Sequence, residues 1–136
     1  MMKTVLILCT GNSCRSQMAE AIVNKHLAGQ VKALSAGTDP QPKVAAGALQ
    51  ALQLAGYATD DLYSKDVDTL LHEPIDLVVT VCNNAQEMCP VFPRAVTTIH
   101  LPFHDPHGEA LDSFIAVRND IEARLLPAIR EALEIQ

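Results

Sequence analysis

The sequence contains no tryptophan, and aromatic residues make up only 4% of its 136 positions. Acidic residues outnumber basic ones by 16 to 10, which gives a formal net charge of -6. Nucleic acids and anionic membranes are bound by basic surfaces, so neither is expected as a partner. No apolar run approaches the ~18 residues of a membrane span, and the N-terminus lacks the features of a signal peptide.

Cysteine is also scarce, with four residues and no Cys-x-x-Cys pair of the structural zinc type. A secreted disulfide scaffold would need more, so we expect a protein of the reducing cytoplasm, where cysteines are more often chemical than structural. The length and the 49% hydrophobic content predict one domain over residues 1–136, large enough to bury a core without disulfide or metal cross-links. We expect a monomer with no tightly bound cofactor.

Strand-like and helix-like apolar segments alternate along the chain. Strands are predicted at Thr4–Leu8, Val31–Ala36, Ile75–Val81 and Val96–Leu101. Helices are predicted after Arg15 up to a cap at Gly29, from Ala45 to Gly56, at Val67–His72, and from about Asp112, with Pro127 bending the last helix or ending its first part. This order predicts a three-layer α/β sandwich with a four-stranded parallel sheet covered on both faces.

Reactive side chains follow the predicted strands. Cys9 follows the first strand, Cys82 the third, and Asp105 the fourth. Because ligands of parallel sheets bind beyond the carboxyl ends of the strands, we expect these residues to meet at one edge of the sheet.

The segment after the first strand can bind an oxyanion; it reads Cys9-Thr10-Gly11-Asn12-Ser13-Cys14-Arg15-Ser16. Its N–H groups can turn inward around a tetrahedral anion, and the following helix N-terminus adds positive potential. Arg15 can grip two oxygens of that anion. The same donors stabilise a thiolate, so Cys9 is predicted to be a nucleophile, and Ser16, the expected N-cap, can donate to its sulfur. The alternative is an ordinary turn with an inert cysteine.

The motifs CTGNSCRSQMAE at residues 9–20, SAGT at Ser35–Thr38 and HDP at His104–Pro106 resemble the low-molecular-weight protein tyrosine phosphatase superfamily. They are most similar to the thioredoxin-coupled arsenate reductases built on that fold, and the resemblance extends over essentially the whole chain. It implies reduction of arsenate to arsenite for arsenic detoxification. It also implies that Cys82 and Cys89 are the second and third relay cysteines, with thioredoxin as the reductant. Cys14 matches a position without an essential role.

A dithiol supplies the two electrons that arsenate reduction needs, whereas a phosphatase needs one thiolate and water. If residues 82–89 were helical, the α-carbons of Cys82 and Cys89 would lie ~10 Å apart, beyond the ~7 Å that a disulfide tolerates. We therefore expect the segment 82–93 to rearrange on oxidation. The alternatives are a buried core thiol at Cys82 and an adventitious loop cysteine at Cys89.

Asp105 is the predicted general acid, since Pro106 restricts its backbone to extended values. A solvated loop aspartate is the alternative. His104 stands where the reductases often carry a second acidic residue. How the surroundings of Asp105 adjust its pKa is therefore left open. His100, His104 and His107 could instead form a zinc site with Cys82 or Cys89, although a bound metal would compete with a catalytic dithiol.

Some reductases of this type hold a structural potassium ion, and the matching oxygen-bearing residues here are Asn12, Glu20, Ser35 and Asp66. Glu20 and Asp66 could equally be surface carboxylates. The main rival function is a phosphatase that hydrolyses phosphotyrosine through a cysteinyl-phosphate, and weak aryl phosphate hydrolysis is expected in either case. The loop around Pro40 lacks the aromatic residues that such phosphatases use to flank the cleft. A non-catalytic anion sensor is a third alternative.

Overall fold

The fold is organised around a sheet of four parallel strands in the order β2-β1-β3-β4. A computed structural model describes residues 2–83, 89–90, 92–93 and 95–136. The strands are β1 (Lys3–Cys9), β2 (Val31–Gly37), β3 (Leu77–Thr80) and β4 (Thr97–His100). The predicted α/β fold with a parallel sheet is confirmed, although β3 and β4 are shorter than predicted.

The two inner strands form the centre of the core. Every residue from Val5 to Leu8 in β1 is fully buried, as are Leu77 to Val79 in β3. Because successive side chains of a strand point to opposite faces, both faces of these strands are covered. At the edge of the sheet, Thr97 and Thr98 of β4 are exposed, so the predicted covering does not extend to this strand.

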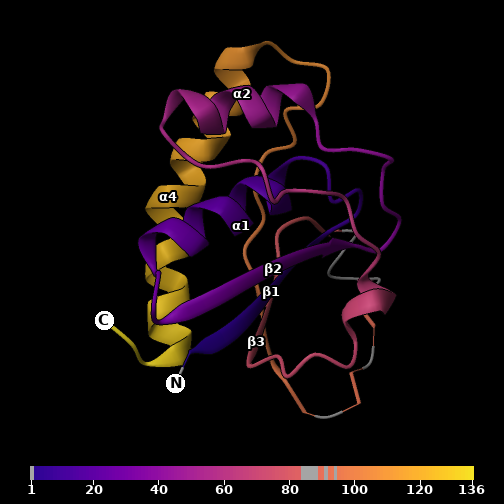
Figure 1. The fold of residues 1–136 in the computed structure, drawn as a ribbon, viewed down its shortest axis with the longest axis vertical. Helices are drawn as coiled ribbons and strands as arrows, with labels where there is room; N and C mark the ends of the chain where they lie inside the picture. The colour runs from indigo at the N-terminus through magenta and orange to yellow at the C-terminus, as the bar shows by residue number, and fades with distance from the viewer. Residues whose placement is uncertain (1, 84–88, 91, 94) are drawn as a thin grey trace.

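Three helices pack against one another beside the sheet: α1 (Arg15–His26), α2 (Ala46–Leu54) and α4 (Leu111–Leu133). Helix α1 lies on β1 and β2, and α4 packs against both α1 and α2 and crosses them (Figure 1). A short 3-10 helix, η1 (Val67–Leu70), stands in place of the helix predicted at Val67–His72. Helix α1 ends at the cap Leu27, so Gly29, with a φ of 85°, lies two residues beyond the cap and is not the cap itself.

Helix α4 continues through Pro127, so the prediction that this proline ends the first part of the helix is wrong. Proline removes the hydrogen bond to the carbonyl four residues earlier, which here belongs to Ala123. Both Ala123 and Pro127 are exposed, so water can solvate that carbonyl. The buried residues Ile121, Leu125 and Ile129 continue on the opposite side and hold the helix by packing.

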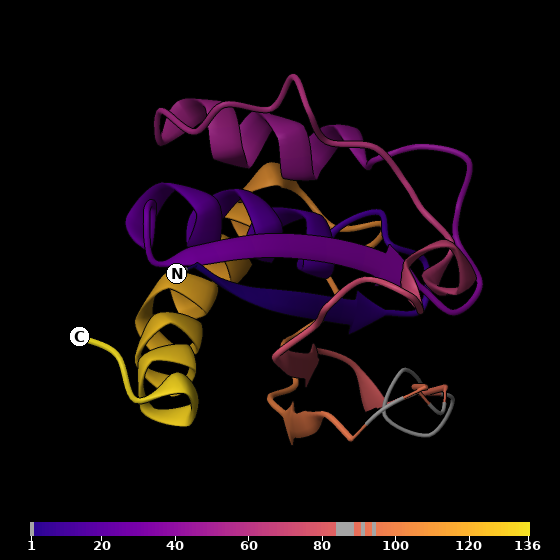
Figure 2. The ribbon, with the colours of Figure 1, turned by 60° about the horizontal axis from the view of Figure 1, so that its bottom comes forward.

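The carboxyl ends of the strands form the edge where the reactive residues were expected. Figure 2 shows β1 and β2 pointing to this edge, with η1 beside the tip of β2 and both termini at the far end. A single bridge between Gly37 and Asp66 joins η1's N-cap to the end of β2. Within the described part of the chain, no helix is both long and apolar enough to cross a membrane.

Candidate active site

The loop after β1 is anchored from outside by its carbonyl groups. The carbonyls of Thr10, Gly11 and Ser13 accept hydrogen bonds of 2.8–2.9 Å from the N–H groups of Asp39, Gln41 and Ala45. In a planar trans peptide the N–H group points away from the carbonyl, so the N–H groups of Gly11, Asn12 and Cys14 face the other way. The N–H of Asn12 accordingly points at the Cys9 sulfur, 3.2 Å away. This arrangement turns N–H donors inward, as an oxyanion requires.

Cys9 ends β1 and lies at the bottom of this loop with 3% of its surface exposed. Its sulfur receives the Asn12 N–H and lies 2.8 Å from the hydroxyl of Ser16. The Ser16 oxygen accepts a hydrogen bond from Asn12 Nδ2 at 2.8 Å, so its own proton can be donated to the sulfur. Two donors therefore face a thiolate at this position, which fits the predicted nucleophile.

Ser16 is not the N-cap of α1, contrary to the prediction. The cap is Cys14, which makes no side-chain capping bond, and Ser16 is a fully buried residue of the first turn. Its hydroxyl is used for the contact with Cys9 rather than for a helix N–H. The tertiary contact thus replaces the local one that serine normally makes at a helix start.

Asn12 is buried and has a φ of 47°, in the left-handed region that few non-glycine residues adopt. Its side-chain oxygen accepts bonds from Gln17 Nε2 at 3.0 Å and from the N–H of Lys65 at 2.8 Å. Gln17 also donates to the Asn12 carbonyl. Gln17 and Lys65 thus hold the strained turn of the loop. Neither was identified as a site residue from the sequence, although Gln17 lies in the quoted motif, and Lys65 is 53 residues from Asn12.

Gly37 at the end of β2 lets the loop approach the sheet. A Cβ added there would lie 2.5 Å from the Thr10 carbonyl oxygen and 3.1 Å from Asn12. Gly37→Ala is therefore expected to displace the loop and to cost about 1–3 kcal/mol of stability, the usual range for overpacking. Thermal melting and inorganic phosphate affinity, measured by calorimetry, should both fall. Wild-type values for both would contradict the packing described for this loop.

Arg15 and Asp105 face each other across the mouth of the loop. Arg15 Nη1 donates to the Phe103 carbonyl at 3.2 Å, and Nη2 lies 3.6 Å from Asp105 Oδ2. The other carboxylate oxygen of Asp105 accepts the N–H of His107 at 3.0 Å. The carboxyl group is thus half-exposed and fixed beside the cation. The segment after β4 reaches the loop as the strand order predicts.

A cavity of about 560 Å³ opens above the loop. It is bounded by Cys9, Arg15 and Asp105 on one side and by the 39–46 segment on the other. One aromatic residue lines it, Phe114 of α4, which the sequence did not single out. Phe114 is buried and packs against Gly47, where a Cβ would lie 2.6 Å from its ring. It is therefore part of the wall between α2 and α4 rather than an exposed platform for a phosphotyrosine ring.

Two further cysteines lie close to Cys9, one beside the loop and one within it. Cys82 is buried beyond β3, and its sulfur is 3.4 Å from the hydroxyl of Thr10, the neighbour of Cys9. Cys14 lies in the loop itself, where burial raises the pKa of its thiol to about 12. The thiol of Cys14 thus keeps its proton at neutral pH, which fits the structural role assigned to it.

Cys89 is half-buried against the core, and burial raises the pKa of its thiol. Residues 84–88, 91 and 94 lie outside the described residues, so the conformation predicted for the segment 82–93 stays a prediction. The described residues place Cys82 at the loop after β1 and Cys89 partly buried against the core.

Two of the three histidines that suggested a zinc site make other contacts. His100 contacts Thr80 at 2.7 Å and Asn83 at 2.9 Å, and His104 contacts Glu109 at 2.8 Å. The contact with His104 lowers the pKa of Glu109. Among the residues that the structure describes, no three His, Cys, Asp or Glu side chains form a group that could hold a metal ion.

The residues matching the potassium site do not offer a free set of oxygens. The Asn12 oxygen already accepts two bonds, and Ser35 donates to Glu20 at 2.7 Å. Asp66 accepts the N–H of Asp68, as the N-cap of η1. The Lys65 ammonium lies 3.5 Å from Glu20, so a second cation there would be repelled. These residues do not fit a bound potassium ion.

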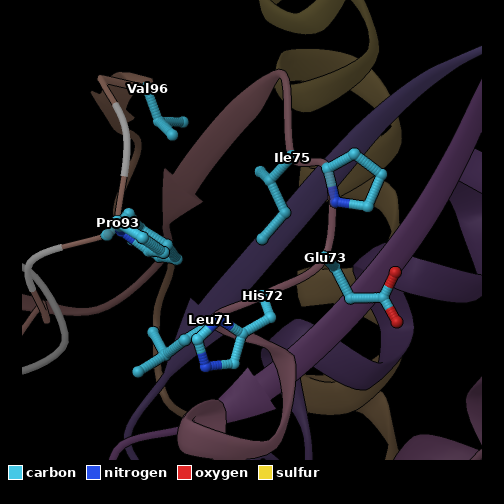
Figure 3. A pocket seen from close by; sticks show the side chains of 8 residues that line it. Leu71, His72, Glu73, Ile75, Pro93 and Val96 are labelled. Atoms are coloured by element: carbon cyan, nitrogen blue, oxygen red, sulfur yellow. The ribbon is translucent and has the colours of Figure 1, made fainter.

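A second cavity, of about 270 Å³, lies near the starts of β3 and β4 (Figure 3). Glu73 and Ile75 line it on one side and Pro93 and Val96 on the other, with Leu71 and His72 between them. None of the described residues around it belongs to the predicted catalytic set, so the chemistry is centred on the loop after β1.

Comparison with known proteins agrees with this geometry. The low molecular weight phosphotyrosine protein phosphatase family matches residues 4–134. A protein named arsenate reductase from Brevibacillus brevis is 40% identical over 90% of this chain and 91% of its own length.

Solved structures of two kinds share the fold. A structure described as an arsenate reductase in the phosphate binding state has a TM-score of 0.79 and 26% identity, covering 96% of this chain and 99% of that one. A low molecular weight protein tyrosine phosphatase from T. tengcongensis has a TM-score of 0.82 at 23% identity, covering 95% and 99%, and shows the fold alone. The chain therefore belongs to the low molecular weight phosphotyrosine protein phosphatase family.

Proposed function

We propose that this member of the family is an arsenate reductase that works through a thiol–disulfide relay. The observation that carries the proposal is the position of Cys82, whose sulfur contacts Thr10 of the oxyanion loop. Hydrolysis of a phosphate ester has no use for a second thiol there, whereas a two-electron reduction needs one. The 40% identity to a protein named arsenate reductase supports the same function.

The first step uses the loop and the acid. Arsenate binds to the inward N–H groups and to Arg15, which stabilise its negative charge. The Cys9 thiolate attacks arsenic, and an arsenic–oxygen bond breaks. The departing hydroxyl group of arsenate takes a proton from Asp105 and leaves as water, so a Cys9–arsenate adduct remains.

The second step transfers the electrons. The Cys82 thiolate attacks the Cys9 sulfur, a disulfide forms, and the sulfur–arsenic bond breaks. The electron pair of that bond stays on arsenic, which leaves as arsenite. The two thiols are thereby oxidised and arsenic is reduced by two electrons.

The third step regenerates the nucleophile. Cys89 attacks Cys82, releases the Cys9 thiolate and leaves a Cys82–Cys89 disulfide, which a dithiol protein such as thioredoxin reduces. Because burial raises the pKa of Cys89, its thiol holds its proton in the reduced protein. Attack thus follows a change that exposes Cys89, as the rearrangement predicted for residues 82–93 would provide. The relay needs thiols between turnovers, so we expect the enzyme to act in the reducing cytoplasm.

Tyrosine phosphatase activity is the second candidate, favoured by Cys9, Arg15 and Asp105 alone. The cavity wall offers only the buried Phe114 among the described residues that line it, so a phosphotyrosine ring would lack an exposed partner. We expect slow hydrolysis of small aryl phosphates and poor activity on phosphotyrosine peptides.

A single-turnover experiment tests the proposed function. Fully reduced protein is mixed with arsenate without any added reductant, and arsenite and disulfides are measured together. Stoichiometric arsenite with a Cys82–Cys89 disulfide in peptide mass spectra is the expected result. Arsenate consumption without a disulfide, or no arsenite at all, would reject the relay.

Asp105→Asn is expected to slow the first step by about 10²–10⁴-fold, the usual contribution of a general acid. The amide cannot give a proton to the departing oxygen, but it can keep the contact with the His107 N–H. Stopped-flow formation of the adduct measures the effect, with the exposed Asp60→Asn as a control expected to match wild type. A loss below about threefold would remove Asp105 from the proposed mechanism.

A further inference from the structure

A buried ion pair lies beneath the catalytic loop. Lys65 Nζ and Glu20 Oε1 are 3.5 Å apart, and their side chains are only 8% and 11% exposed. The other ion pairs of the described residues have at least one side chain more than 30% exposed. A buried charge is costly unless an opposite charge compensates it. Removal of either Lys65 or Glu20 would therefore leave the other as an uncompensated buried charge.

This ion pair is connected to the nucleophile by side chains. Glu20 accepts the hydroxyl of Ser35 at 2.7 Å, and Ser35 accepts Asn12 Nδ2 at 3.0 Å. The same Asn12 amide donates to Ser16, whose oxygen lies 2.8 Å from the Cys9 sulfur. The charge state of Glu20 therefore affects a continuous series of contacts that ends at the thiol.

Lys65 is held in place at both its backbone and its ammonium. Its N–H donates to Asn12 at 2.8 Å, and its carbonyl accepts the N–H of Gly37 at 2.8 Å. The ammonium donates to the Tyr63 carbonyl at 2.8 Å and lies 4.3 Å from the centre of the Tyr63 ring. A lysine fixed in this way presents its charge to Glu20 without any bound ion.

We propose that the Lys65 ammonium is the resident cation of this site and a positioning residue for Cys9. It neutralises Glu20, which keeps Ser35, Asn12 and Ser16 in the orientation that directs a hydroxyl at the sulfur. The protein consequently needs no bound potassium ion, although its sequence matches a potassium site. This inference stands apart from the substrate of the enzyme, because it concerns the thiol alone.

Two substitutions separate charge from packing. Lys65→Met removes the charge, keeps most of the side-chain volume and leaves Glu20 uncompensated. Adding Glu20→Gln removes the second charge, while the amide oxygen can still accept the Ser35 hydroxyl. Lys32→Ala, at an exposed position of β2, is the control for loss of one positive charge.

The experiment measures thermal melting and the rate of Cys9 alkylation by iodoacetamide, followed on the Cys9 peptide by mass spectrometry. Both are recorded in potassium chloride and in choline chloride, whose cation is too large for the site. Wild type and Lys32→Ala should give the same values in both salts. Lys65→Met should melt lower and alkylate about tenfold more slowly, and the double variant should regain most of both.

Three results would overturn the proposal: a wild type that melts higher in potassium, a Lys65→Met variant that alkylates normally, or a double variant no better than the single one. If Lys65→Met does not fold, a folded double variant with normal alkylation still supports the proposal, and an unfolded one rejects it. No arm uses arsenate, so failure of the proposed function would leave this test unaffected.

Discussion

Cys89→Ser should release arsenite once and then stop. The first two steps need only Cys9 and Cys82, which the structure places at the same loop through Thr10. Without Cys89 the Cys9–Cys82 disulfide has no internal thiol to resolve it. Steady-state turnover with thioredoxin should fall by at least about 100-fold, equivalent to roughly 2.7 kcal/mol in the barrier.

Peptide mass spectrometry after one turnover identifies the trapped species. The Cys89→Ser variant should accumulate a Cys9–Cys82 disulfide, whereas wild type should accumulate Cys82–Cys89. Sustained turnover of the variant would show that the reductant attacks the first disulfide directly, and the third step would then be wrong.

Cys82→Ser should separate the two chemistries of the site. Serine can keep a contact with Thr10, but it cannot form a disulfide with Cys9, so no arsenite is expected. Aryl phosphate hydrolysis needs only Cys9, Arg15 and Asp105, and it should stay within about threefold of wild type. The expected result is an enzyme without reductase activity that keeps its slow phosphatase activity.

The hydrolysis of p-nitrophenyl phosphate by the same variant is the internal control for folding and for the loop. Loss of both activities would mean that Cys82 supports the structure of the site. Retention of arsenate reduction would mean that a thiol other than Cys82 forms the disulfide with Cys9. The relay through Cys82 would then be wrong.

Local patterns were sufficient to predict the sheet and the place of the site. The apolar strands, the loop from Cys9 to Arg15 and the position of Asp105 after the last strand depend on residues close in sequence. Parallel strands then bring these segments to one edge. The contact of 3.6 Å between Arg15 and Asp105 is the outcome of that topology.

Long-range contacts account for what the sequence did not predict. Ser16 was expected to cap a helix, but its hydroxyl faces Cys9, seven residues earlier. Pro127 was expected to bend α4 or to end its first part; it does not end the helix, because its missing bond lies on the exposed side of a helix held by packing. Gln17 lies in the motif at residues 9–20 and Lys65 lies in none, and the contacts of both with Asn12 appear only in the folded chain.

The composition excluded polyanions, yet the site is suited to a small oxyanion. A net charge of -6 weakens binding over a broad surface. Inside the cavity the field is set by oriented N–H groups and by Arg15, which act at short range in a partly buried place. The net charge governs binding of a polyanion over the whole surface, whereas the N–H groups and Arg15 govern binding of a small oxyanion at hydrogen-bond distance. The two conclusions therefore agree.

The central claim is tested most directly by NADPH consumption in the presence of thioredoxin and its reductase. The account predicts arsenate-dependent oxidation of NADPH by wild type, with p-nitrophenyl phosphate hydrolysed far more slowly under the same conditions. Rapid phosphate ester hydrolysis with no arsenate-dependent NADPH oxidation, by protein whose four cysteines are all reduced at the start, would contradict it and identify the enzyme as a phosphatase.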